Sequence, residues 1–201
     1  MSEAVTTDHL EKAFLLRHWL SGTQKQDFEL SEKMRIAASV ANAVLALYQT
    51  SWIPNDPDSE HILLVASTPT RVCMLTDVLP NAIEPKRTPW VKYVRNPMLF
   101  HLGVLLIELV FGKSIDRLAD LVGYQFSSER PRWRESMNIA DALLAKGCVL
   151  DQGGLNYEDA VRNSFWKDFG GSYEDTSGTK EAFRRAVFEA VITPLADNVA
   201  G

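Results

Sequence analysis

The fold is decided by one stretch, residues 96–113, which reads NPMLFHLGVLLIELVFGK. Between residues 98 and 111 only His101 and Glu108 can carry charge. Pro97 suits the first turn of a helix, because its missing N–H needs no partner there, and Gly112 is typical of a helix C-terminus. We therefore expect a helix of about four turns that is apolar nearly all round. A bilayer-spanning helix needs about 20 apolar residues, so the stretch predicts the buried central helix of a globular domain.

Length and composition narrow the class of protein. The 201 residues suit one domain, or one domain with an appendage, and a hydrophobic content of 46% indicates a packed core. A net charge of −5 argues against non-specific binding to nucleic acid and against attraction to an anionic membrane. Cys73 and Cys148 belong to no CxxC pair, which fits a reducing compartment and leaves a disulfide between them open. The polar N-terminus shows no secretory signal, so we expect a cytoplasmic protein, with the nucleus as the open alternative.

A first helix is expected over residues 9–20. Thr7 or Asp8 is placed to cap its N-terminus. His9 and His18 lie on opposite sides of such a helix, so we interpret them as surface or cap residues and not as metal ligands.

A polar linker, residues 23–29, leads to a second long helix. This helix is predicted over residues 32–48, where alanines and larger apolar residues share one broad face. The sequence therefore divides into an N-terminal helix and linker, residues 1–29, and a main domain, residues 30–198.

The remainder predicts a mainly α fold with a short two-stranded β element. The strands are expected at residues 61–66 and 70–75, after a loop rich in proline and aspartate. Ser114 and Asn156 are expected to cap two of the later helices. Besides the central stretch, helical spacing predicts helices at residues 114–122, 132–148, 156–165 and 180–195.

The order of these elements and two motifs resemble the C-terminal lobe of the protein-kinase fold. Residues 102–109 read LGVLLIEL and precede Gly112-Lys113, which is similar to the FGVLLxEL and GK of the kinase central helix. Residues 56–64 read DPDSEHILL, which is similar to the kinase catalytic loop, DLKxxNILL.

The sequence is more similar still to a large, uncharacterised group of fungal proteins with a degenerate kinase-like domain. The motifs of that group resemble TPWL, NPLLFALGILLIELCFGK and YxxAVRxCL. Their counterparts here are TSWI at residues 50–53, the central stretch, and YEDAVRNSF at residues 157–165. The resemblance covers roughly residues 30–198 and implies a helical domain like the kinase C-terminal lobe.

The resemblance also implies that catalysis has been lost. A kinase needs a Gly-rich loop and a strand lysine to hold the phosphates, but the sequence has no GxGxxG, and the segment before residue 30 is too short for a small lobe. The catalytic aspartate falls on Asp56, and the magnesium-binding asparagine falls on His61, a poor ligand because magnesium prefers oxygen. Only Asp77 carries a carboxylate near the expected DFG site. Asp56 and His61 are therefore interpreted as vestigial positions, with no catalytic residue, no cofactor and no metal.

Side chains of the loop and of the central helix allow several interpretations. Asp56 and Asp58 are expected to stabilise a proline-containing turn, with a working carboxylate pair, or a divalent ion shared with His61, as the minor alternatives. His101 is expected to be a hydrogen-bonded core histidine. Because an unpaired buried carboxylate is costly, Glu108 is expected to pair with an arginine, for which the candidates are Arg130, Arg132 and Arg134.

Three functions compete. The first is a non-catalytic, kinase-like module that binds a protein partner whose identity the sequence does not reveal. The second is a residual nucleotide-binding or phosphoryl-transfer enzyme with Asp56 as base, which would need an N-terminal lobe supplied from elsewhere. The third is a peripheral membrane protein, which the acidic charge and the short apolar stretch oppose. We rank the first highest, with binding to neither nucleic acid nor membrane.

Overall fold

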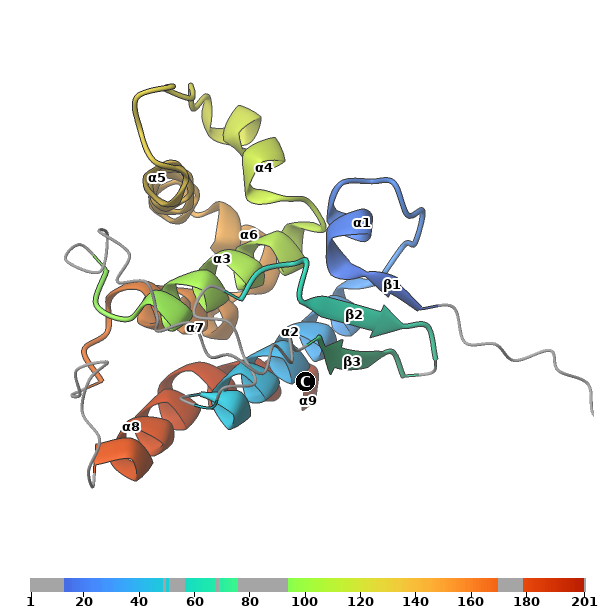
Figure 1. The fold of residues 1–201 in the computed structure, drawn as a ribbon, viewed down its shortest axis with the longest axis vertical. Helices are drawn as coiled ribbons and strands as arrows, with labels where there is room; N and C mark the ends of the chain where they lie inside the picture. Colours follow the sequence, from blue (N-terminus) through green and yellow to red (C-terminus); the bar gives the residue numbers. More distant parts are fainter. Residues whose placement is uncertain are drawn as a thin grey trace, which may run out of the picture.

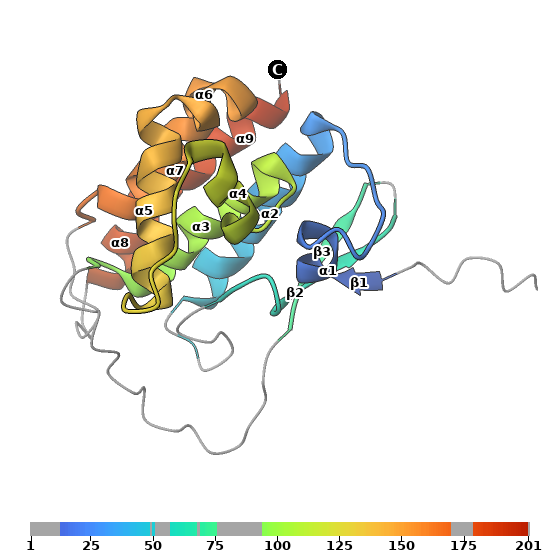
Figure 2. The same ribbon diagram turned by 90° about the horizontal axis from the view of Figure 1, so that it is seen from above.

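The computed structural model describes residues 13–48, 50, 57–67, 69–75, 94–169 and 179–200. Within these ranges the protein is mainly helical, with a small antiparallel sheet at one end of the helical body (Figures 1 and 2). The strands are β1 (Ala13–Leu15), β2 (Ile62–Val65) and β3 (Arg71–Met74). The helices are α1 (Leu16–Leu20), α2 (Leu30–Leu47), α3 (Pro97–Phe111), α4 (Ile115–Val122), α5 (Arg132–Ala145), α6 (Cys148–Gly153), α7 (Leu155–Trp166), α8 (Thr179–Val187), a π-helical turn (Phe188–Ile192) and α9 (Thr193–Ala200).

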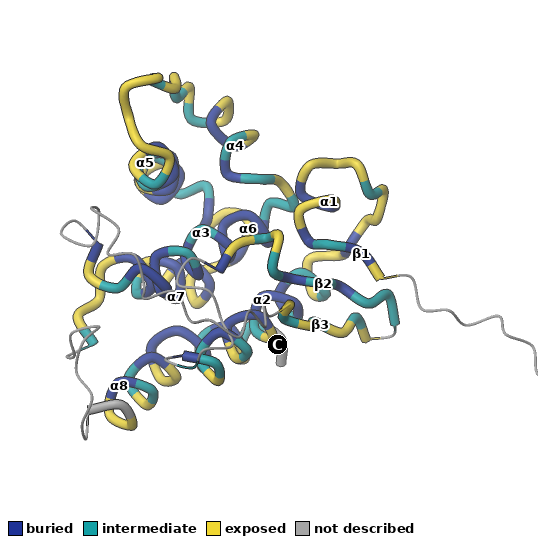
Figure 3. Tube along the Cα trace, viewed as in Figure 1, coloured by how far each residue is buried: buried dark blue, intermediate teal, exposed yellow. Residues whose placement is uncertain are grey.

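The central helix is α3, and its ends lie where the sequence predicts them. The Asn96 side chain accepts a hydrogen bond from the Leu99 N–H at 3.1 Å, so Asn96 caps the helix before Pro97. Gly112 ends it with φ of 64°, a left-handed conformation that glycine adopts without strain. Most of its side chains are buried, which confirms the prediction of a buried central helix (Figure 3).

Helices pack around α3 on several sides. α2 and α7 make its main contacts, and α9 packs against both of them. Gly103 allows the close approach of α7, because a Cβ atom there would lie only 2.9 Å from the Phe165 ring. α4 packs mainly against α5, at the periphery of the body (Figure 1). Together these contacts produce one continuous hydrophobic core.

The sheet has three strands and not the predicted two. β2 and β3 confirm the expected pair, with Leu64 opposite Val72. The added strand is β1, in which Phe14 lies opposite Leu64. The predicted helix over residues 9–20 is therefore wrong over Ala13–Leu15, because pairing with β2 replaces local helical bonds there; residues 9–12 and the expected caps lie outside the described residues.

The segment that follows β1 packs on the end of the central helix. Trp19 and Phe28 are buried edge to face, with ring centroids 5.0 Å apart. A Cβ atom on Gly112 would lie 3.1 Å from the Trp19 ring, and the Ser114 N–H donates to the Leu20 carbonyl at 3.3 Å. The described part of residues 1–29 thus shares the core of the helical body.

Two predicted helices are interrupted. The one expected over residues 132–148 ends at Ala145, because Gly147 adopts φ of 70° and α6 begins after it. The C-terminal one contains the π-helical turn, where the Ala190 carbonyl accepts a hydrogen bond from Asn163 Nδ2 on α7 at 2.8 Å. The predicted capping of α7 by Asn156 is wrong, because Gly154 occupies the cap position and the helix begins at Leu155.

Among the described residues, no single helix has the length and apolar character needed to cross a bilayer. Taken together, α3 and α4 meet that test of length and composition, with a bend of 71° between them.

Candidate functional site

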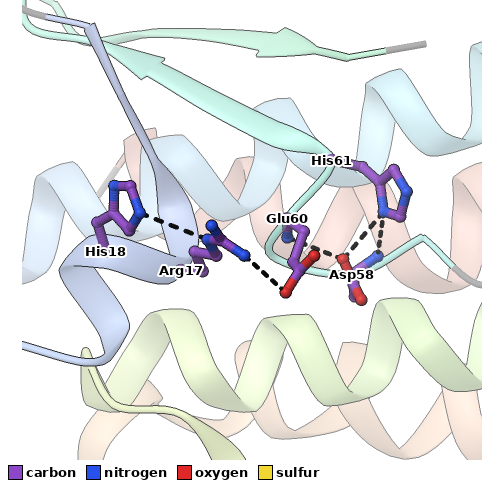
Figure 4. A network of polar contacts seen from close by, with 5 residues as sticks. All are labelled: Arg17, His18, Asp58, Glu60 and His61. Carbon is purple, nitrogen blue, oxygen red and sulfur yellow. Dashed lines mark hydrogen bonds and ion pairs between the residues drawn. The ribbon is translucent and has the colours of Figure 1, made fainter. Parts of the chain in front are cut away.

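A tight turn before β2 carries the described part of the predicted catalytic-loop counterpart. The Asp58 carbonyl accepts from the His61 N–H at 3.1 Å, and Asp58 Oδ1 accepts from the Glu60 N–H at 2.8 Å. The same Oδ1 lies 2.9 Å from His61 Nδ1 (Figure 4). Asp58 therefore stabilises the turn, as its aspartate-rich sequence predicted. Asp56 and Asp77 lie outside the described residues.

The corner between β1 and α1 lies against this turn. The Arg17 N–H donates to the Ser59 carbonyl at 3.1 Å, and Arg17 Nη1 lies 2.9 Å from Glu60 Oε1. Arg17 Nε lies 3.4 Å from His18 Nε2, which completes the network in Figure 4. The Arg17 and Glu60 side chains are 45% and 60% exposed, so their ion pair contributes at most about 1 kcal/mol. The backbone bond is what joins the two segments.

His61 is oriented by its contact with Asp58. Nδ1 lies 2.9 Å from Asp58 Oδ1, a bond that requires a proton on Nδ1, and 3.4 Å from the Asp58 N–H, a bond that requires its lone pair. The shorter contact favours the tautomer with the proton on Nδ1, in which Nε2 is the acceptor. In the part of the chain that the structure describes, Nε2 of His61 has no hydrogen-bond partner. The Asp58–His61 contact resembles the aspartate–histidine contact of a catalytic triad, in which the carboxylate orients the imidazole. No described residue lies next to His61 as the nucleophile of such a triad.

The side chains that could bind a metal ion are dispersed in the described ranges. No group of three or more His, Cys, Asp or Glu side chains there is placed to hold an ion. Asp58 and His61 supply two donors, and their nearest donor atoms are bonded to one another.

Glu108 lies close to the same region, at the C-terminal end of α3. Its side chain is buried, and its Oε1 accepts a hydrogen bond from the Ile115 N–H at 2.8 Å. Burial raises the pKa of Glu108 to about 7; the bond from Ile115 opposes that rise, and the charges of Asp116 and Asp58 add to it.

The predicted arginine partner of Glu108 is wrong. Among the described residues the carboxyl has a backbone partner, Ile115, and forms no ion pair. Arg132 pairs instead with Asp116, and Arg130 donates from Nη1 to the Tyr124 hydroxyl at 3.1 Å. At longer range the Arg132 charge lowers the pKa of Glu108 slightly. His101 lies on α3, half-buried, with its ring edge to face with Phe100.

A second buried carboxylate, Glu135, was not singled out by the sequence. The Tyr124 hydroxyl donates to its Oε2, and the Ser127 N–H donates to its Oε1 at 3.0 Å. Tyr124 in turn accepts from Arg130 and from Asn138, at 3.1 and 2.9 Å. The bond from Tyr124 is the main reason that the pKa of Glu135 is lowered. This network holds residues 123–131, the α4–α5 loop, against α5.

Neither Glu135 nor Arg17 carries a local signal of its role. A glutamate in the first turn of a helix suggests only a favourable interaction with the helix dipole. Arg17 sits in a segment that reads as helix, and its partner Glu60 is far away in the sequence. Only the path of the chain brings the Tyr124 hydroxyl and the Ser127 N–H to Glu135.

Comparison with known proteins places the chain in a family without linking it to kinases. Comparisons with curated proteins and with solved structures yield no significant match. The model of one family, described as a domain of unknown function (DUF7580), matches residues 4–201, nearly the whole length. The matched residues include the three strands of the sheet and the central helix α3, so the sheet and the helical body belong to one family unit. The chain is therefore a member of the DUF7580 family.

Proposed function

We propose that the chain is a non-catalytic helical module, similar to the C-terminal lobe of protein kinases, that binds another protein. The observation that carries the proposal is the exposed corner made by the end of α4 and the α4–α5 loop. Here Leu121 and Phe126 are 52% and 51% exposed. A contiguous apolar patch on an ordered surface is typical of a protein-binding site.

The α4–α5 loop is held in place before any partner arrives. Glu135 binds it through the Tyr124 hydroxyl and the Ser127 N–H, and Tyr124 contacts the Phe126 ring edge to face at 5.9 Å. A loop ordered in advance loses less conformational entropy on binding. The buried network therefore supports a role for this loop in presenting Phe126.

The turn around Asp58 supports a non-catalytic interpretation. Its polar atoms hold the turn itself, and Arg17 ties the turn to the N-terminal segment. These contacts favour a structural role for the turn. Cys73 and Cys148 are both free, which supports our proposal of a reducing, cytoplasmic location.

Site-specific crosslinking tests the binding surface. A photoreactive phenylalanine analogue is placed at Phe126 in the full chain, expressed in its natural host, and compared with the same analogue at Leu155, which is 64% exposed on α7. We expect one discrete crosslinked species from position 126 that Leu121→Asp abolishes. Equal crosslinking from both positions, or none at 126, contradicts the proposed surface.

Nucleotide binding separates the module from the residual enzyme. We expect no change in Tm on adding ATP with Mg²⁺ and no phosphoryl transfer by the purified chain. A Mg-ATP-dependent rise in Tm that Asp56→Ala abolishes would favour the enzyme.

A further inference from the structure

Glu108 supplies the N-terminal cap of α4 from another helix. Ser114 occupies the cap position, but its hydroxyl makes no capping bond. The first N–H of the helix, that of Ile115, is instead bonded to Glu108 Oε1 at 2.8 Å. The backbone carbonyl of Glu108 also accepts from the Lys113 N–H, at 3.2 Å. One residue therefore fixes both the end of α3 and the start of α4.

Most of the charged groups around the Glu108 carboxyl disfavour its ionised form. Asp58 faces it from the turn before β2, and Asp116 faces it from the first turn of α4. Arg132 on α5 opposes them, but its guanidinium is paired with Asp116. The adjoining elements carry further cations. Arg17 pairs with Glu60, and Arg117 donates to the Leu20 carbonyl. Lys33 lies over the Trp19 ring, and Lys113 follows the end of α3.

We propose that proton binding to the Glu108 carboxyl controls how firmly the N-terminus of α4 is held against α3. In the protonated acid, Oε1 still accepts from the Ile115 N–H, while the proton resides on Oε2 and no net charge is buried. In the ionised carboxylate the bond to Ile115 strengthens, but a buried charge then faces Asp58 and Asp116.

We expect the protonated and ionised forms of Glu108 to be equally populated near neutral pH. Burial outweighs the bond to Ile115, and the pKa of Glu108 rises to about 7. α4 has few contacts with α3 beyond this junction and packs mainly on α5, so the junction is the place where a change in charge is transmitted to α4. The proton-binding step concerns the fold, and it stands whether or not a partner binds the exposed corner.

Carbon-detected NMR titration of the full chain measures the step directly. The Glu108 carboxyl carbon should titrate with a midpoint near pH 7. Asp116→Asn should lower that midpoint, and Arg132→Gln should raise it, each by about half a pH unit, because each changes one nearby charge. Glu135→Gln is the matched control: it alters another buried carboxylate and should leave the midpoint unchanged.

The second readout is hydrogen exchange at the Ile115 amide, corrected for the intrinsic pH dependence of exchange. We expect protection to fall by about tenfold between pH 6 and pH 8 in the natural chain, because opening the junction releases the buried charge to water and this gain outweighs the stronger bond to Ile115. In Glu108→Gln, which keeps the accepting oxygen without the charge, protection should stay level. A Glu108 midpoint below pH 5, or an Ile115 transition that persists in Glu108→Gln, overturns the proposal.

Discussion

Gly103 shows how one absent side chain determines a helix contact. Its Cα faces the ring of Phe165, and a Cβ atom there would lie 2.9 Å from two ring carbons. Those carbons belong to a buried side chain that also packs edge to face with Phe100, at 5.6 Å between centroids. The ring cannot move without disturbing the contact of α3 with α7.

Gly103→Ala should therefore destabilise the protein, although alanine normally favours a helix over glycine. Overpacking costs about 1–3 kcal/mol, and nearly all of that range exceeds the gain of about 1 kcal/mol in helix propensity. Urea unfolding measures the difference. A double-mutant cycle with Phe165→Leu should recover about 1 kcal/mol of the loss. If Gly103→Ala raises stability, the close contact is not present in solution.

Glu108 makes stability depend on pH in a direction opposite to that of most carboxylates. Its pKa is about 7 in the folded state against an ordinary 4.5, so the folded state binds the proton more tightly. This contribution is fully present below about pH 4.5, falls as pH rises, and is lost above about pH 7.

The expected size of that loss is about 3 kcal/mol, from the shift between the two pKa values. Urea unfolding at intervals from pH 5 to pH 8.5 should show the decline in the natural chain. Glu108→Gln should be nearly level over the same interval. A parallel decline in both proteins would mean that another group is responsible.

At the scale of elements, the π-helical turn is stabilised from a neighbouring helix. The Ala190 carbonyl is buried and accepts from Asn163 Nδ2 at 2.8 Å, while Phe188 O accepts from the Thr193 hydroxyl at 3.2 Å. Widened helical turns disturb the regular hydrogen-bond pattern, so side-chain donors stabilise them.

Asn163→Ala should cost about 1–2 kcal/mol, because it leaves a buried carbonyl without that donor. Thermal unfolding followed by circular dichroism provides the measurement. Asn198→Ala is the control, since Asn198 donates to the Gly153 carbonyl at a longer distance, 3.3 Å. Equal losses in the two variants would contradict a special role for Asn163.

Elements whose signals are local were predicted well. Asn96, Pro97 and Gly112 mark the ends of α3, and the strands β2 and β3 lie within their predicted ranges. β1 was missed because its state depends on pairing with β2, which is far away in the sequence. The π-helical turn was missed because its five residues follow ordinary helical spacing.

The candidate site was predictable only in part. The role of Asp58 follows from turn chemistry, which is local. The sequence predicted a partner for Glu108 only because burying an unpaired carboxylate costs free energy. That argument requires a hydrogen-bond donor but does not identify it, and the donor is a backbone N–H of the next helix. The role of Arg17 was missed for the same reason as β1. Their partners, Glu60 and β2, are far away in the sequence and come close only in the folded chain.

At the scale of the whole molecule, the N-terminal segment is expected to unfold together with the helical body. Trp19 is 6% exposed, packs against Phe28 and donates from Nε1 to the Gln26 carbonyl at 2.8 Å. Trp19→Ala should cost about 3–5 kcal/mol. Trp166→Ala, at a residue that is 39% exposed, should cost clearly less.

Urea unfolding followed both by circular dichroism and by tryptophan fluorescence checks this expectation. Coincident transitions would show that the segment before residue 30 belongs to the same cooperative unit. A separate, earlier transition removed by Trp19→Ala would instead support the predicted division at residues 29 and 30.

The π-helical turn also has a consequence for how the family's sequences line up. Such a turn holds one residue more than the α-helical path that it replaces, while the helices on either side keep their faces toward the core. Phe188, which is 49% exposed, can be deleted without removing a core side chain. Relatives that lack the turn should therefore be one residue shorter between residues 188 and 192, and an alignment gap at this position would trace when the insertion arose.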